Sequence, residues 1–419
     1  MSSRPLLPRR FIRGFPAGQE PYRVNNDLYE RYDQRNNLTV GRPNWDAKLQ
    51  NFTSEARRTA VRLKWIRSGQ SGYGLQDYSL YQAAGVANKN LGTDENHANR
   101  GLTSWTRLRA RVADVAEVGR WEGSPSEATT LVKRVARFFG ADLVGIASLD
   151  RRWIYSHAFW PDGSHKEIVF DDVDVPLEEA ERMVIPEKMQ WVMVLAARMD
   201  WQTVQYCPAP TGCSEVQSTY SQMAVLVAGV AEFLRGIGYQ AIPSLNGVGL
   251  NIPMAIDAGL GEQGRHGKLI TAEFGPSVRL CKVITDLPLV ADRPIQFGVT
   301  RFCEVCRKCA DACPAGAIPS GERTWLGASL SDNRGVYTWH LNNEACRKYF
   351  VLGNADPCAI CIRVCPFSKS SRRVHDLTRL FISRAPVLDP VWVKLDDLLG
   401  YGRQRDAAQF WTAEEGSLG

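Results

Sequence analysis

The chain has 419 residues, more than one compact core usually holds, so we expect two or three packed units. Hydrophobic residues make up 44% and charged residues 23% of the sequence, which excludes a disordered chain. The net charge of +6 is spread along the chain and favours an ordinary solvated surface, so no nucleic-acid partner is expected. No apolar run reaches the roughly 18 residues of a membrane-spanning helix.

An irregular N-terminal unit with short helices is predicted for residues 1–123, where Asn, Arg, Gly and aromatic residues prevail and clear periodicity is missing. Arg9-Arg10-Phe11 resembles the start of a twin-arginine export signal. Polar sequence follows it, however, instead of the apolar segment of roughly 7–15 residues that completes such a signal. Two interpretations stay open: a cytoplasmic protein, or a processed exported form associated with the outer face of the cytoplasmic membrane.

A mixed core of helices and strands is predicted for residues 124–297. Its first helix has a clear start, because Ser124 is a capping residue, Pro125 suits the first helical position and Glu127 completes a capping box. Apolar residues then recur at helical spacing, and Gly140 is placed to end the helix.

Apolar runs at 142–147 and 192–196 predict buried strands, with an insertion at about 150–190 between them, and residues 221–235 show helical periodicity. Helices that alternate with short apolar strands indicate an α/β or α+β fold. Residues 243–300 are dense in Gly and Pro. Such a segment is either backbone that passes close to a large ligand or an ordinary set of turns.

Cysteine is the most informative residue type, because 8 of the 11 cysteines fall between positions 303 and 365. Such crowding indicates metal rather than a disulfide framework. The run Cys303-x2-Cys306-x2-Cys309-x3-Cys313-Pro314 matches the bacterial two-cluster ferredoxin run. The other four cysteines of the block are Cys346, Cys358, Cys361 and Cys365, the last of which precedes Pro366.

The spacing predicts two 4Fe–4S clusters with crossed ligands. Thiolates separated by two residues can wrap one cube, whereas the cysteine three residues further on binds the other cluster. The first cluster is expected to be held by Cys303, Cys306, Cys309 and Cys365. The second is expected to be held by Cys313, Cys358, Cys361 and, by elimination, Cys346. Zinc is the competing interpretation, but four-cysteine zinc sites use two separated CxxC pairs. We expect a bacterial-ferredoxin-like two-cluster domain at 298–368 and a C-terminal tail at 369–419.

The sequence before this block resembles the reductive dehalogenase family. Residues 131–156 read LVKRVARFFGADLVGIASLDRRWIYS, which is similar to a stretch of that family. Residues 257–289 carry three further motifs of the same kind. They are Ala258-Gly259-Leu260-Gly261-Glu262, Glu273-Phe274-Gly275-Pro276 and Thr285-Asp286-Leu287-Pro288-Leu289. The resemblance extends from about residue 105 to about residue 370.

The resemblance implies an α+β fold with a nitroreductase-like corrinoid-binding core at 124–297. It also implies a cobalamin held base-off, and the Asp-x-His-x-x-Gly box of histidine-ligated corrinoids is indeed absent, since residues 95–100 lack its Asp and Gly. The implied reaction removes halide from an organohalide with two electrons and one proton. The implied partners are a low-potential electron donor (ferredoxin, flavodoxin or a membrane quinol chain) and a membrane anchor protein.

Two alternatives from other classes stay open. One is an enzyme similar to epoxyqueuosine reductase, which acts on transfer RNA and shares an Ala-Gly-Leu-Gly loop like that at 258–261. The other is an electron-transfer iron–sulfur protein without corrinoid. The aromatic-rich N-terminal part and the Arg152-Trp153-Ile154-Tyr155 stretch favour a dehalogenase.

The resemblance also points to site residues. Tyr220, ahead of a predicted helix, matches a tyrosine that donates the proton, and Lys282 matches a basic residue about sixty positions later whose charge stabilises the phenolate. Asn246 matches an asparagine that lines the substrate pocket. The loop Gly259, Leu260, Gly261 and Glu262 is expected to touch the nucleotide tail of the corrinoid. The competing interpretations are a packed tyrosine, a solvated lysine and two ordinary turns.

Overall fold

The computed structural model describes residues 12–412 except 17, 40, 54, 85–90, 92–100, 106–118, 161–162, 355–357 and 370–372. The arginine pair at 9 and 10 and the histidine at 97 therefore lie outside the described residues. Among the residues that are described, no helix combines the length and apolar character needed to cross a membrane.

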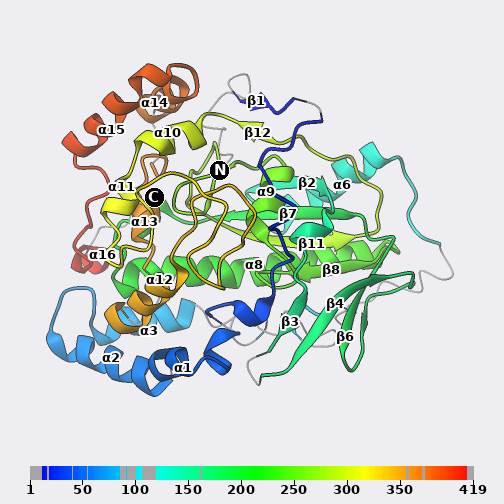
Figure 1. The fold of residues 1–419 in the computed structure, drawn as a ribbon, viewed down its shortest axis with the longest axis horizontal. Coiled ribbons are helices and arrows are strands. Elements are labelled where there is room, and N and C mark those ends of the chain that lie inside the picture. The colour runs from blue at the N-terminus through cyan, green and yellow to red at the C-terminus, as the bar shows by residue number, and fades with distance from the viewer. Residues whose placement is uncertain are drawn as a thin grey trace.

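A four-stranded antiparallel sheet forms the centre of the fold (Figure 1). Its strands lie in the order β2, β7, β11, β8, with bounds Leu143–Ser148, Trp191–Arg198, Val278–Thr285 and Ala241–Ser244. The apolar run at 192–196 lies in β7 and is buried, because this inner strand is covered on both faces. The two predicted strands are thus confirmed, and so is the mixed helix-and-sheet class.

Helices cover both faces of this sheet. On one face, α6 (Pro125–Phe138) and the long helix α8 (Pro210–Gly236) pack against side chains such as Met193. On the other face, α9 (Asn251–Asp257) packs against side chains such as Val194. Because successive residues of a strand point to opposite faces, each strand supplies both cores in alternation.

The predicted start of α6 is confirmed. Ser124 Oγ accepts a hydrogen bond from the Glu127 N–H, and the Glu127 carboxylate accepts one from the Ser124 N–H at 2.8 Å. Helix α8, by contrast, begins eleven residues before the predicted start at 221, at Pro210. Residues 211–214 read Thr-Gly-Cys-Ser, which are weak helix formers that hid its first turns. Tyr220 therefore lies inside the helix and not ahead of it.

The insertion at about 150–190 forms a second four-stranded sheet beside the core (Figure 1). Its strands lie in the order β3, β4, β6, β5, with bounds His157–Phe159, His165–Asp171, Arg182–Pro186 and Leu177–Glu178. Two smaller two-stranded sheets pair β1 with β12 and β9 with β10. Their strands are Arg13–Gly14, Ile295–Gln296, Glu262–Gln263 and Leu269–Ile270.

The N-terminal part packs onto the core through aromatic and charged side chains. Tyr22 and Tyr29 both meet the buried ring of Trp153 edge to face, with centroids 5.0 and 5.5 Å away. The Arg31 guanidinium donates hydrogen bonds to the carbonyls of Ile154, Tyr155 and Ile168. Helices α1, α2 and α3 follow at Ala47–Thr53, Glu55–Ser68 and Leu75–Ala84. The chain is thus anchored at 22–31, before its first helix.

The cysteine block folds into short helices, each of which carries cysteines. They are α10 (Val299–Val305), α11 (Lys308–Asp311), α12 (Asn343–Tyr349) and α13 (Ile360–Arg363). The tail beyond this block is not irregular, since it forms α14 (Arg373–Arg384), α15 (Asp389–Leu398) and α16 (Ala408–Thr412). Ion pairs tie α15 to the cysteine block, among them Arg301 with Asp389 at 3.1 Å.

Candidate active site

Four cysteines from both ends of the block surround one small cavity. Cys303 and Cys306 lie at α10, Cys309 lies on α11, and Cys365 reaches the same place from beyond α13. His266, Pro366 and two phenylalanines complete the lining of this cavity. This group, called group I below, is the set that the spacing predicted for the first cluster.

The other four cysteines form a second group. The negative charge of a Cys361 thiolate raises the pKa of Cys346 and that of Cys358. The charge of a Cys313 thiolate likewise raises the pKa of Cys346 and that of Cys361. This set is called group II. The two groups adjoin: Cys309 of group I and Cys358 of group II belong to one cluster of packed side chains, against which Cys313 and Cys361 also pack. Electrons could therefore pass directly between clusters held by the two groups.

The surroundings of both groups suit metal-bound thiolates better than free thiols. Burial raises the pKa of Cys303 to about 12 and those of Cys306 and Cys346 to about 11. Burial likewise raises the pKa of Cys365 far above its ordinary value. A thiolate in such a setting needs a cation to offset its desolvation, and the iron of a cluster supplies one. The residues present therefore fit two clusters.

A large cleft lies where the N-terminal part, the core and the cysteine block meet. Its volume is about 410 Å³, within the roughly 300–1,000 Å³ of ligand pockets. Its walls come from 22–39, 153–155, 250–268 and 331–350, and one wall includes Cys346 of group II. The cleft is thus a ligand site of ordinary size that lies directly beside group II.

One wall of the cleft contains a buried carboxyl group. The Tyr22 hydroxyl donates to Asp257 Oδ1 at 2.7 Å, and Trp153 Nε1 donates to Asp257 Oδ2 at 3.1 Å. Burial raises the pKa of Asp257 to about 6, and these two hydrogen bonds offset only part of the increase. The carboxyl group therefore joins the N-terminal segment to α9 at the edge of the cleft.

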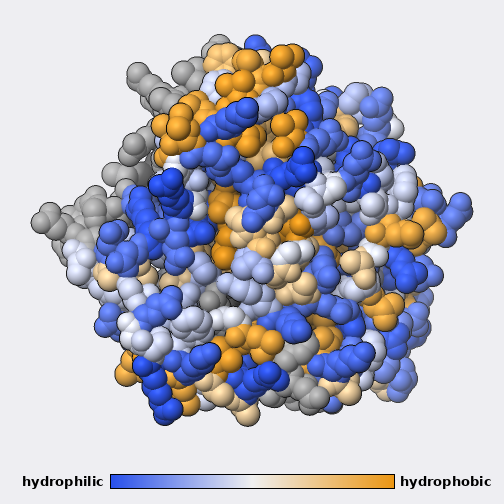
Figure 2. All heavy atoms as spheres, turned by 60° about the vertical axis from the view of Figure 1, so that its left-hand side comes forward, coloured by the Kyte–Doolittle hydropathy of each residue, from blue (hydrophilic) through white to orange (hydrophobic). Residues whose placement is uncertain are grey.

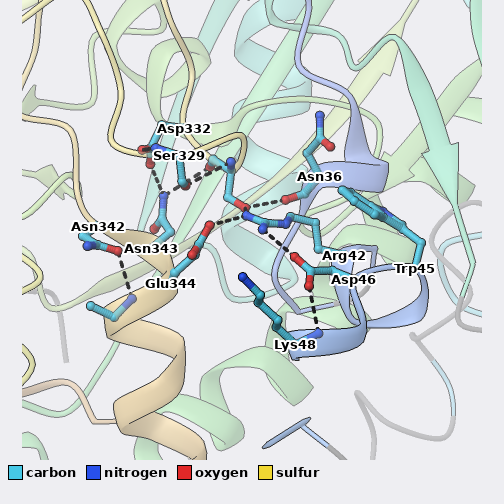
Figure 3. Close-up of polar contacts among 12 residues, drawn as sticks. Asn36, Arg42, Trp45, Asp46, Lys48, Ser329, Asp332, Asn342, Asn343 and Glu344 are labelled. Atoms are coloured by element: carbon cyan, nitrogen blue, oxygen red, sulfur yellow. Dashed lines mark hydrogen bonds and ion pairs between the residues drawn. The ribbon is translucent and has the colours of Figure 1, made fainter. Parts of the chain in front are cut away.

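A buried arginine, Arg42, contacts the cleft wall at Ser331 (Figure 3). Arg42 donates to Asp46 at 2.7 Å, to Glu344 at 2.5 Å and to Ser331 Oγ at 3.1 Å. Glu344 belongs to α12, the helix that carries Cys346. Arg42 therefore connects the N-terminal part to a helix of group II and to the cleft wall at Ser331.

Tyr220 stands at the end of a chain of polar side chains. Its hydroxyl accepts a hydrogen bond from Asn246 Nδ2 at 3.1 Å, and Asn246 Oδ1 accepts one from Asn251 Nδ2 at 3.3 Å. Tyr155, which lines the cleft, donates to the Asn246 carbonyl at 3.0 Å. The structure therefore brings Tyr220 and Asn246 together, as the sequence analysis expected, and connects them to the cleft.

Lys282 fastens the loop that carries Asn246. Its ammonium group is fully buried and donates to the carbonyls of Gly247 at 2.8 Å and Gly249 at 3.0 Å, and to Asn251 Oδ1 at 2.8 Å. Between the two glycines, Val248 has a φ of 64°, which is rare and costly for a β-branched residue. Lys282 is thus not a solvated lysine, and it holds a strained loop beside Tyr220.

The cation that lies against Tyr220 is Arg279, which the sequence analysis missed. Its guanidinium carbon is 5.5 Å from the centre of the tyrosine ring, and its buried Nε has no hydrogen-bond partner. Arg279 and Lys282 are three residues apart on β11, so they point to opposite faces of the sheet. Tyr220 packs on the face of Cys281 and Val283, which is also the face of Arg279. Strand periodicity was the signal that could have identified Arg279.

The loop expected to touch a corrinoid packs inside the protein. A Cβ on Gly261 would lie 2.2 Å from the Ile270 carbonyl oxygen, and Glu262 accepts hydrogen bonds from the N–H groups of Phe297 and Val299 at the start of α10. The four residues 259–262 do not line the cleft, whose lining passes from Ile256 directly to Gln263. The loop thus joins the core to the cysteine block, and its contact with a cofactor stays a prediction.

The comparisons with known proteins agree with this geometry. A sequence profile described as "Reductive dehalogenase subunit" matches residues 47–289, more than half of the chain. A second profile, described as "4Fe-4S double cluster binding domain", matches residues 302–368. The chain belongs to the reductive dehalogenase family.

Relatives of this family member include two proteins named "Tetrachloroethene reductive dehalogenase". The one from Sulfurospirillum multivorans is 40% identical over 306 residues, which cover 70% of this chain and 61% of the relative. The one from Dehalobacter restrictus (strain DSM 9455 / PER-K23) is 36% identical over 329 residues, with coverages of 72% and 59%. The chain therefore spans about three fifths of the length of these relatives.

A solved structure described as "Catabolic reductive dehalogenase NpRdhA, N-terminally tagged" shares the fold. It superimposes with a TM-score of 0.65 at 21% sequence identity, over 96% of this chain and 51% of the other. An "Epoxyqueuosine reductase" from Lactococcus garvieae (strain Lg2) is 29% identical over 147 residues, 34% of this chain. The likeness to the dehalogenase thus covers far more of the chain.

Replacing Cys313 tests the crossed arrangement of the ligands. Cys313→Ser is expected to damage the cluster of group II and to spare that of group I, although Cys313 lies in the same sequence run as Cys303, Cys306 and Cys309. Electron paramagnetic resonance of the reconstituted, reduced protein can distinguish the two clusters. Loss of the group I signal instead would show that the ligands are not crossed.

The buried Asp257 predicts a pH dependence of stability. Because its pKa is raised from 3.8 to about 6, the folded chain holds this proton more tightly than the unfolded chain. Its contribution to the free energy of unfolding is therefore present at low pH and is lost as the pH rises through this window. Asp257→Asn should remove that fall, whereas the fully exposed Asp174→Asn should not. Denaturant unfolding at several pH values between 3.8 and about 6 measures the free energy of unfolding. The same pH dependence of this free energy in Asp257→Asn and in the wild type would contradict the prediction.

Proposed function

We propose that this chain is a corrinoid-dependent reductive dehalogenase, which removes halide from an organohalide with two electrons and one proton. One observation carries the proposal: Tyr220, with Arg279 against its ring, lies next to group II. Tyr220 and Cys361 pack against the same apolar cluster, and Arg279 acts on the charge of Cys361. A proton donor and an electron source are thus neighbours at one site.

The cofactor assignments follow from the fit described above. Cys303, Cys306, Cys309 and Cys365 would hold one 4Fe–4S cluster, and Cys313, Cys346, Cys358 and Cys361 the other. A cobalamin would occupy the large cleft of a nitroreductase-like core and, when bound, would supply the electrons to the carbon–halogen bond. We propose that it binds base-off, and His340 is the cleft residue that could act as a lower ligand instead. His340 Nε2 lies 3.0 Å from the Val336 carbonyl, a contact that requires the proton on that nitrogen.

The chain's own residues supply and direct the proton. Tyr220 would give its hydroxyl proton to the organic fragment, and the positive charge of Arg279 would stabilise the phenolate that remains. Asn246, held by Asn251 and by the loop that Lys282 fastens, would fix the direction of the Tyr220 hydroxyl. Lys282 is thus proposed as a positioning residue, and Arg279 takes the role that the sequence analysis gave to Lys282.

The substrate and partners are proposed from the relatives. Relatives named for tetrachloroethene favour a small chlorinated alkene, which has no groups that need hydrogen bonds. The reaction needs a low-potential electron donor from outside the chain. We propose a cytoplasmic location, where such a donor would be a ferredoxin or flavodoxin. The alternative is a processed exported form on the outer face of the cytoplasmic membrane, with a membrane anchor protein.

Metal content and halide release test this function together. Anaerobically reconstituted enzyme should contain about eight iron atoms and one cobalt atom per chain, as two cubanes and one corrinoid require. With reduced methyl viologen it should release chloride from tetrachloroethene. The Co(II) spectrum should show no nitrogen coupling, and coupling that His340→Ala abolishes would disprove the base-off proposal. Iron without cobalt and without chloride release would leave only an electron-transfer protein.

Replacing Tyr220 and Arg279 tests the proton donor. Tyr220→Phe should lower turnover by about 10²–10⁴-fold, the contribution of a positioned acid, while clusters and corrinoid still load. Arg279→Met should also lower turnover, Arg279→Lys should be milder, and the double variant should lose less than the product of the single losses. Single-turnover kinetics isolates the chemical step. A wild-type rate for Tyr220→Phe in that step would assign the proton to another group.

A further inference from the structure

Helix α15 leaves a stripe of apolar side chains exposed to solvent. Val387, just before the helix, and Val391 and Leu398 on it are 86%, 54% and 82% exposed. On its inner side, Asp389 and Asp396 are 1% and 8% exposed, and Trp392 and Val393 pack against the apolar cluster around Cys303. The helix is thus apolar on two sides, whereas an ordinary surface helix has one apolar stripe, which faces the core.

The inward orientation is fixed by ion pairs with the cysteine block. Asp389 pairs with Arg301 at 3.1 Å, and Asp396 pairs with Lys369 at 2.8 Å and with Lys308. These contacts, together with the packing of Trp392 and Val393, decide which side of α15 faces inward, and they leave its other apolar residues to water. The exposed apolar residues of α14, α15 and the turns beside them are called the C-terminal apolar face below. They are Phe381, Val387, Leu388, Val391, Leu395, Leu398 and Leu399.

The C-terminal apolar face is a continuous surface feature. Figure 2 shows hydrophobic residues gathered over the end of the molecule where α14 and α15 lie. Large exposed apolar patches that are rimmed by polar residues mark interaction sites. The rim here carries the exposed cations Lys394 and Arg403, whereas the exposed carboxylate Asp397 is paired with Lys308 at 2.8 Å. The rim therefore favours an acidic partner.

This face adjoins the outer cysteine group. Group II touches the cleft through Cys346, so group I is the one farther from the proposed corrinoid. α10, which carries Cys303, packs against both α14 and α15, and Val305 between Cys303 and Cys306 is exposed. An electron that comes from outside would therefore enter at group I, beside the C-terminal apolar face.

We propose that the C-terminal apolar face is the docking surface for an acidic, soluble, low-potential one-electron carrier protein of the ferredoxin or flavodoxin class. The inference rests on the proposed function. Each docked carrier gives one electron to the group I cluster and leaves oxidised by one electron, so two dockings supply one dehalogenation. Such a carrier must dissociate after each electron, and transient redox partners bury little surface.

The test measures cluster reduction in the oxidised holoenzyme by stopped-flow absorbance. The donors are a reduced two-cluster ferredoxin, flavodoxin hydroquinone and reduced methyl viologen. The triple variant Val391→Ser, Leu395→Ser, Leu398→Ser should react about tenfold or more slowly with at least one protein donor, as expected when central apolar contacts of an interface are removed. It should react with methyl viologen at the wild-type rate. Phe138→Ser, which removes an 83% exposed side chain from α6, is the matched control and should change nothing.

The positive charge at the rim of the C-terminal apolar face allows a second experiment. Lys394→Glu should slow reduction by the same protein donor and weaken its dependence on salt, because steering of an acidic carrier is electrostatic. Halide release with methyl viologen reports the proposed function separately, so the two can fail independently.

Three results would overturn the proposal. One is equal reduction of the triple variant and the wild type by both carriers. Another is no reduction of the wild type by either carrier while methyl viologen reduces it. The third is binding to phosphatidylglycerol–phosphatidylethanolamine vesicles, or dimer formation, that the triple variant abolishes, since the occupant would then be a bilayer or a second copy.

Discussion

Eight cysteine thiols are packed into a part of the chain that has little apolar core of its own. An ionised thiolate there, without a cation, would bear the full cost of leaving water. The described part of residues 298–368 is built largely of short helices and turns, which suits a chain that wraps around two compact charged clusters. Metal binding and folding of such a region are one process, because the site exists only in the folded chain. The cleft, the helices and the ion pairs around the cysteine block depend on this need for a cation beside the buried thiolates.

The two faces of the central sheet divide the work of the proposed site. β11 presents Arg279 on the face of α8, where Tyr220 lies, and Lys282 on the other face, where it fastens the loop of Asn246. Because Arg279 and Lys282 are three positions apart on the strand, they lie on opposite faces. The Arg279 guanidinium faces Tyr220, whereas the Lys282 ammonium group donates hydrogen bonds to backbone carbonyls.

Local patterns predicted much of this structure. The capping box at Ser124, the apolar strand at 192–196 and the grouping of the cysteines could all be predicted, because each depends on neighbours in sequence or on a fixed ligand spacing. That Arg279 and not Lys282 lies against Tyr220 could not be predicted from their distance to Tyr220 in the sequence. It depends on which face of the strand meets α8. The helices of the tail were not predicted either, because α15 is apolar on its solvent side as well as on its inner side and lacks the single apolar stripe of a surface helix.

The contact of Arg42 with Glu344 bears on how the wall of the cleft is completed. The cleft is walled on one side by residues from the first tenth of the chain, and these are tied to a helix more than three hundred positions later. The cleft is therefore complete only when residues 22–42 are docked on a helix that lies far downstream in the sequence. A change that releases this part of the chain is thus expected to remove one wall of the cleft.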